Sequence, residues 1–208
     1  MKEFTSKTVG TLSLATGIAG TLAVITLILF FVSLFQDISS LSFMGTLNDT
    51  INGLSGILSA VLASTLHPAL RRVAGRLSLT LLIGVWLGAT AIGFGSWLII
   101  SGGSDVEQSS YYYFFGNGLI GIWIWVLNRT AREHAVWTDS LTRLGWIASG
   151  FMMVGLLGLV GILSGSDGGE YSPLIMINGI SYLGIAILYP IWGILLGRWI
   201  LSKRGKTQ

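Results

Sequence analysis

The sequence predicts an all-α polytopic membrane protein with six transmembrane helices in a single domain over residues 1–208. Only 10% of its residues are charged and 52% are hydrophobic, whereas an ordinary soluble domain is about 25% charged. Six uncharged stretches are each long enough to cross a bilayer, which takes about 20 helical residues. All 12 Lys and Arg residues lie at the same ends of these stretches. Because Lys and Arg are retained on the cytoplasmic side, both termini are predicted to be cytoplasmic.

The six stretches are predicted to pair into three hairpins. The first is too long for the apolar part of a signal peptide, which has only about 7–15 residues, so we expect a retained span. The last contains Pro190, which should bend its helix by removing a backbone hydrogen bond. The stretches are 8–36, 50–70, 77–104, 108–128, 144–166 and 171–197. The hairpins cover about 8–70, 77–128 and 144–201, and residues 202–208 are predicted to form a basic cytoplasmic tail.

The charged residues divide between the two ends of the predicted helices. Basic residues at the inner ends are expected to anchor the chain to anionic lipid headgroups. They are dispersed rather than gathered with aromatic residues, so no nucleic-acid partner is expected. The anchoring residues are Arg71, Arg72, Arg76, Arg129, Arg132, Arg143, Arg198, Lys203 and Arg204. The acidic residues of the predicted outer connections are Asp37, Asp49, Asp105, Glu107, Asp167 and Glu170.

A short pattern recurs where each hairpin returns. An Asn-Gly dipeptide lies early in the second stretch of each hairpin, at Asn52, Asn117 and Asn178. In the first and third hairpins a serine follows three residues later, at Ser55 and Ser181. Many transporter folds are built from internal repeats of this kind. The sequence therefore predicts three parallel hairpin repeats.

Two interpretations of these polar positions are open. In the functional one, the three amides form a ring in a central cavity and bind a polar ligand, a headgroup or a cation. In the structural one, each amide hydrogen-bonds to a neighbouring helix or to backbone carbonyls near a helix start, and contributes about 0.6–2 kcal/mol. Convergence of Asn52, Asn117 and Asn178 on one cavity favours function, whereas separate contacts between helices favour structure.

The sequence offers one weak sign of catalytic chemistry. The segment from Gly53 to Gly56 resembles the nucleophile motif of rhomboid intramembrane proteases, in which Ser55 would need a histidine within hydrogen-bond reach. His67 is about 18 Å further along the same predicted helix, and His134 lies in an inner connection. Cysteine is absent, and neither histidine is placed as a haem ligand. We therefore expect no enzymatic activity, no metal and no cofactor.

Glycine pairs at four-residue spacing predict close helix packing. The pairs are Gly84 with Gly88 and Gly193 with Gly197. Small residues at this spacing let helix backbones approach closely, either within one chain or between copies of it. Internal packing is the favoured interpretation, and self-association or contact with other membrane subunits is the alternative.

The second and third predicted helices resemble a bacterial membrane family of unknown function. The resemblance rests on Asn52-Gly-Leu-Ser55 and on His67-Pro-Ala-Leu-Arg-Arg72 before an apolar stretch. Segments 118–128 and 144–161 are similar to later helices of that family, so about half the chain is covered. The resemblance implies a fold of six or seven helices and no established activity.

These observations predict a non-enzymatic protein of the cytoplasmic membrane, with both termini inside the cell. The leading expectation is an accessory subunit or a component that binds lipid or another small ligand. The alternative is a small transporter or channel with its polar site at the three Asn-Gly positions. The expected partners are membrane lipids and other membrane subunits.

Overall fold

The computed structural model describes residues 4, 6–39, 43–103, 106–165 and 173–204, and in these residues the chain is helical with no strand. Four long helices come first. They are α1 (Lys7–Phe35), α2 (Met44–Ala74), α3 (Leu77–Ser101) and α4 (Val106–Glu133). A fifth rod joins α5 (Asp139–Val154), a 3-10 turn (Gly155–Leu157) and α6 (Gly158–Ser164). The last rod joins α7 (Pro173–Gly179), a π-helical segment (Leu183–Leu188) and α8 (Tyr189–Arg204).

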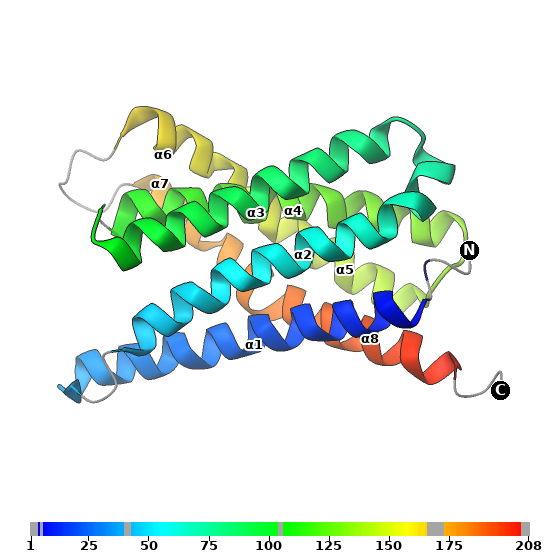
Figure 1. The fold of residues 1–208 in the computed structure, drawn as a ribbon. Helices are drawn as coiled ribbons and strands as arrows, with labels where there is room; N and C mark the ends of the chain where they lie inside the picture. The colour runs from blue at the N-terminus through cyan, green and yellow to red at the C-terminus, as the bar shows by residue number, and fades with distance from the viewer. Residues whose placement is uncertain (1–3, 5, 40–42, 104–105, 166–172, 205–208) are drawn as a thin grey trace.

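The rods form a closed bundle in which each one packs against the next in the chain. Contacts join α1 to α2, α2 to α3, α3 to α4 and α4 to α5, and α1 closes the bundle by packing against α8. We call the end where α1, α3 and α6 finish the acidic end, and the opposite end the basic end. The basic end carries both termini (Figure 1).

Five of the rods are long and apolar enough to cross a membrane, which confirms the all-α class and the presence of several membrane-spanning candidates. The remaining long helix, α4, contains more Tyr, Trp and Asn. It contacts α2, α3, α5, α6 and α7, and its Trp123 and Ile124 are fully buried. Much of α4 therefore faces protein, where polar and aromatic groups find partners that lipid cannot supply.

The helices extend beyond the uncharged stretches that predicted them. Helix α2 begins at Met44 rather than near residue 50, which places Asn48 and Asp49 inside it. Helix α8 continues to Arg204, so the start of the predicted tail is helical, and residues 205–208 lie outside the described part. A charged side chain ends an apolar stretch but not a helix, because a helix continues with its polar residues beyond the hydrocarbon.

The sequence predicts a bend at Pro190, and in the structure the last rod is interrupted on the N-terminal side of Pro190. Proline has no backbone N–H to donate, and the six residues Leu183–Leu188 are wound as a π-helix. Towards the acidic end, the Ile180 N–H donates to the carbonyl oxygen of Ile177 at 3.0 Å, a tight turn between α7 and the π-helical segment. The interruption redirects the rod, so α7 lies beside α6 while α8 lies beside α1 (Figure 1).

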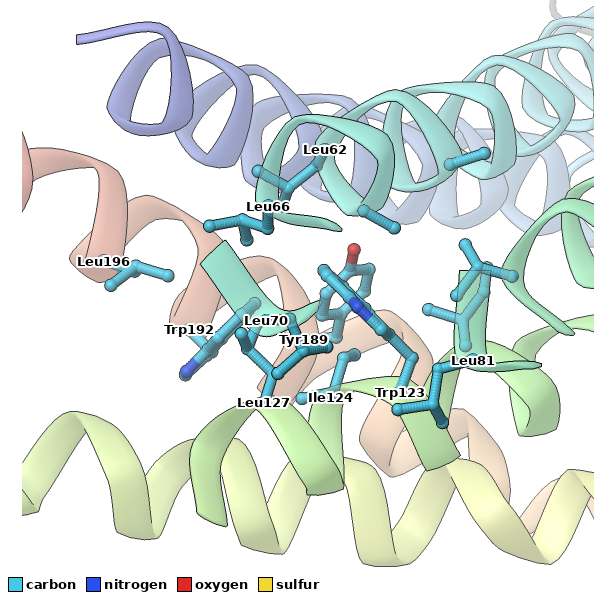
Figure 2. Close-up of a cluster of buried hydrophobic side chains, with 14 of the residues drawn as sticks. Leu62, Leu66, Leu70, Leu81, Trp123, Ile124, Leu127, Tyr189, Trp192 and Leu196 are labelled. Atoms are coloured by element: carbon cyan, nitrogen blue, oxygen red, sulfur yellow. The ribbon is translucent and has the colours of Figure 1, made fainter. Parts of the chain in front are cut away.

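The basic half of the bundle interior is filled by large apolar side chains from α2, α3, α4 and α8 (Figure 2). Trp123 and Trp192 are the largest of the fully buried side chains. The residues of this apolar core are Leu62, Leu66, Leu70, Leu81, Trp123, Ile124, Leu127, Tyr189, Trp192 and Leu196. These apolar side chains occupy the centre of the basic half of the bundle.

Close packing of α3 against α4 gives a matched test with two glycines of one helix. A Cβ at Gly88 would lie 2.5 Å from the carbonyl oxygen of Gly116, whereas a Cβ at Gly84 would meet nothing within 4 Å. Gly88→Ala should therefore destabilise the protein by about 1–3 kcal/mol through overpacking. Gly84→Ala should be neutral or stabilise by up to about 1 kcal/mol, because alanine favours the helix. Thermal unfolding in detergent measures both, and equal losses would show that the two glycines occupy similar surroundings.

Candidate functional site

Two adjoining cavities lie between the apolar core and the acidic end. The deep cavity, of about 30 Å³, is lined by residues of α1, α2, α3, α4 and the last rod. The acidic-end cavity, of about 40 Å³, is lined by residues of α2, α3, α4 and the last rod. Both are lined by Asn48, Asn52, Tyr113 and Tyr182, so a shared polar wall joins them. Each has room for about two or three water molecules or for a small polar group.

Helix α2 supplies one polar face to the deep cavity. The lining residues Asn48, Asn52, Ser55 and Ser59 follow one another at intervals of four, three and four, which places them on one side of a helix. Asn52 and Ser55 on this face were predicted from the sequence, whereas Asn48 and Ser59 were not. The helical spacing itself was the signal that would have found them.

A directional chain of hydrogen bonds runs along the shared wall. The Tyr113 hydroxyl donates to Asn52 Oδ1 at 3.4 Å. Asn52 Nδ2 donates to Asn48 Oδ1 at 3.1 Å, and Asn48 Nδ2 donates to the carbonyl oxygen of Ala23 at 2.6 Å. The chain links α4, α2 and α1. Each of the two amides uses one of its two N–H groups in these bonds, which leaves donor capacity beside the cavities.

The floor of the deep cavity is a second hydrogen-bonded pair. Ser59 donates to the carbonyl oxygen of Ser55 at 2.8 Å, and its oxygen lies 2.9 Å from the Tyr189 hydroxyl. Because the serine hydrogen is already used, Tyr189 is the donor to Ser59. The Tyr189 ring stacks on Trp192 at a centroid distance of 5.9 Å. Tyr189 therefore joins the polar cavity to the apolar core.

The three asparagines of the repeat do not all converge. Asn52 and Asn117 line the deep cavity, and Asn117 Nδ2 also donates to the carbonyl oxygen of Tyr113 at 2.9 Å. Asn178 lines neither cavity. Its side chain is 0% exposed, and neither amide atom has a hydrogen-bond partner among the described residues. The predicted ring is thus represented by two amides of three.

The two predicted serines differ in the same way. Ser55 lines the deep cavity, whereas Ser181 is buried and donates to the carbonyl oxygen of Asn178 at 2.6 Å. Ser181 follows the turn that separates α7 from the π-helical segment. Its hydroxyl therefore partners a backbone group near the interruption, where the helical hydrogen bonding is incomplete.

The histidines partner other groups than Ser55. His67 Nδ1 lies 2.8 Å from Ser78 Oγ at the basic end, and His134 Nδ1 lies 3.0 Å from the carbonyl oxygen of Thr130. A serine nucleophile needs a base within about 3 Å. In the part of the chain that the structure describes, no histidine is placed to act on Ser55.

The predicted headgroup-anchoring residues lie at the basic end. Arg129 forms an ion pair with Glu133 at 2.9 Å, and the Arg132 guanidinium lies 4.9 Å from the ring centroid of Trp146. The side chains of Lys203 and Arg204 lie outside the described part, although their backbone continues α8. The exposed residues of the set are Arg71, Arg72, Arg76, Arg129, Arg132, Arg143 and Arg198.

The class of this protein is assigned from its structure, because comparison with known proteins finds no match. No family model matches the chain, and no curated protein or solved structure is significantly similar to it. The structure is an all-helical bundle with several apolar rods, which is compatible with a membrane protein. Within it, polar residues gather in two joined cavities near the acidic end.

The buried amides give a matched test of which asparagine stabilises the fold. Asn48→Leu should destabilise the protein by about 0.6–2 kcal/mol, because it removes a hydrogen bond between α1 and α2. Asn178→Leu should be neutral or stabilise by up to about 1–3 kcal/mol, because it replaces an unpaired buried amide with an apolar group of similar size. Thermal unfolding of both variants in detergent measures the difference. A large loss on Asn178→Leu would mean that its amide has a partner.

Proposed function

We propose that this chain is a non-enzymatic, multi-pass protein of the cytoplasmic membrane that binds a small ligand or the headgroup of a lipid in the two joined cavities. The observation that carries the proposal is the shared wall of Asn48, Asn52, Tyr113 and Tyr182. Amide and phenol groups at membrane depth are costly unless they have partners. A wall that gathers four such side chains around open space supports a binding site.

The interruption of the last rod supports the same proposal. Tyr182, Ile185 and Ala186, from the π-helical segment and the residue before it, line the deep cavity. Irregular backbone at membrane depth is tolerated where it is buried in protein or lines a cavity. In transporters, irregular backbone of this kind commonly lies at the substrate site. Segments of π-helix are also frequently found at functional sites.

The shape of the interior supports a site with access from one side. Below the deep cavity lie the Ser59–Tyr189 hydrogen bond and then the apolar core (Figure 2). The acidic-end cavity continues the opposite way, towards the ends of α3 and α4. We propose that a ligand enters from the acidic side of the membrane and stops at Tyr189.

For the membrane arrangement, we propose six spans with both termini in the cytoplasm, grouped as three hairpin repeats. The positive-inside pattern supports this orientation. The burial of α4 among the other helices explains how a less apolar helix also crosses. The exposed face of α1, with Ile18, Leu22 and Ile25, suits contact with lipid or with another membrane subunit. The resemblance to the bacterial family of unknown function also remains a proposal.

A second candidate function is a small transporter. It is favoured by the interrupted last rod, because the turn at Ile180 and the π-helical segment Leu183–Leu188 are two irregular places where a rod can hinge. Transport requires the Ser59–Tyr189 contact and the apolar core to open towards the basic end. A binding protein or accessory subunit requires no such opening, so flux across a vesicle membrane separates the two functions.

The absence of cysteine makes the topology directly testable with single-cysteine variants. In intact cells, a membrane-impermeant maleimide should label Gln36→Cys and should leave Thr138→Cys and Ser202→Cys unlabelled until the cells are opened. The reason is that Gln36 follows α1, whereas Thr138 follows α4 and Ser202 lies near the end of α8. Labelling of Thr138→Cys in intact cells would show that α4 does not cross.

The ligand site is tested by a structure and native mass spectrometry of protein purified in nanodiscs. A small molecule or lipid should co-purify, with density beside Asn52 and Asn117. Asn52→Leu should reduce its occupancy at least fivefold, because the substitution removes the central member of the hydrogen-bonded chain. Asn178→Leu is the matched control, since its amide lies outside both cavities, and it should keep the bound molecule. An empty, dry interior in the unmodified protein would contradict the proposal.

A further inference from the structure

Asp49 gives the acidic-end cavity a negative charge without a basic partner. It lies on α2 beside Asn48, is half-buried and lines the cavity. No Lys, Arg or His lines either cavity in the part of the chain that the structure describes. A carboxylate removed from water is stabilised by a nearby opposite charge. Among the described residues that line this cavity, none supplies that charge.

Aromatic rings stand beside the carboxylate. Tyr113 and Tyr182 line the same cavity as Asp49, and their ring centroids are 5.9 Å apart. An edge contact with Phe114 at 5.2 Å holds the Tyr182 ring in place. The faces of tyrosine rings attract cations within about 6 Å of the centroid. A cation in this cavity would therefore lie beside two aromatic rings as well as the carboxylate.

A fully buried hydroxyl on the cavity wall lacks a partner. Ser109 lines the acidic-end cavity, is 0% exposed, and its Oγ has no hydrogen-bond partner among the described residues. Its neighbour Ser110 also lines the cavity and donates to the carbonyl oxygen of Val106 at 2.6 Å, so its oxygen lone pairs can accept. Buried polar groups are normally paired, so the unpaired Ser109 hydroxyl points to a ligand that hydrogen-bonds to it.

The charge of the whole acidic end acts in the same direction. Among the described residues at this end, Asp37, Asp49 and Glu107 are acidic and none is Lys or Arg. A surface of one sign concentrates ligands of the opposite sign near a cavity that opens on it. Cations are therefore drawn towards this end, and anions are repelled.

From these observations we infer that the acidic-end cavity binds the ammonium group of a primary amine, with Asp49 as its counter-ion. This inference rests on the proposed function and adds the chemical class of the ligand. A primary ammonium has three N–H donors, and the wall of this cavity offers acceptor oxygens on Asp49, Ser109 and Ser110. A cavity of about 40 Å³ suits this compact group better than a bulky quaternary one.

The test is calorimetric binding to the full chain in phosphatidylcholine nanodiscs, with the signal of empty nanodiscs subtracted. The probes are n-hexylamine, 1-hexanol and hexanoate, which share a chain and differ in charge. Hexylamine should bind saturably with one molecule per chain, and hexanoate at least tenfold more weakly. Asp49→Asn should weaken hexylamine at least tenfold and remove its advantage over hexanol.

Asp37→Asn is the matched control. It makes the same charge change at the same end, but Asp37 is exposed in the connection after α1 and lines neither cavity. Its backbone has a φ of 53°, which asparagine tolerates well, and hexylamine affinity should stay within twofold. Ser109→Ala, a milder change at the cavity wall, should weaken hexylamine at least threefold and serves if Asp49→Asn fails to fold.

The outcomes separate this inference from the proposed function. Equal affinity for hexylamine and hexanoate, or unchanged hexylamine binding in a folded Asp49→Asn variant, overturns the ammonium inference. If hexanol then binds as well and Asn52→Leu abolishes its binding, the ligand site stands and only the preference for cations fails. If none of the three probes binds and no molecule co-purifies, both proposals fail.

Discussion

The close contact between α1 and α8 is the constraint on which the rest of the structure depends. A Cβ at Gly17 would lie 2.6 Å from the carbonyl oxygen of Pro190, and one at Gly20 would lie 2.6 Å from the proline ring. The two backbones therefore touch only because these positions lack side chains. On the N-terminal side of Pro190 the last rod leaves α1: its π-helical segment packs mainly against α5, and α7 packs against α6. Helix α1 stays with α2. The deep cavity lies where the two rods separate, with Gly20 on one wall and Ala186 on the other.

Tyr189 lies at the boundary between the apolar half and the polar half of the interior, and it contacts both. Its ring stacks on Trp192, and its hydroxyl hydrogen-bonds to Ser59. Tyrosine suits such a boundary, since one end is apolar and the other needs a polar partner. On one side the leucines and tryptophans close the bundle, and on the other the asparagines and tyrosines surround open space. A ligand on the polar side would therefore meet a closed wall at Tyr189.

The features of the fold that depend on the apolar length of a segment or on a single proline were predictable from the sequence. Apolar length predicted the helical rods, and Pro190 indicated a departure from regular helix in the last one, because both depend on local chemistry. The turn at Ile180 and the π-helical segment Leu183–Leu188 were not predicted. The cavity was predicted only in part. Asn52, Asn117 and Ser55 were found through a repeated motif, but Tyr113 and Tyr189 carry no local sign of a site. Their roles arise from helices far apart in the chain. Hydropathy alone does not identify α4 as a candidate span. Hydropathy reflects how well a helix suits lipid, and α4 packs against other helices of the protein.

The three Asn-Gly dipeptides show why a repeated sequence does not ensure a repeated environment. A Cβ at Gly118 would lie 2.7 Å from the backbone nitrogen of Leu156, one at Gly53 would meet its first neighbour at 3.8 Å, and one at Gly179 would meet nothing within 4 Å. The glycine after Asn117 thus permits a tight helix contact, whereas the glycine after Asn178 ends α7. Because the last rod is interrupted there, Asn178 is carried away from the position that Asn52 and Asn117 share. The same interruption places Tyr182 at the cavity. An aromatic ring of the last rod therefore lines the polar wall, and the third amide does not.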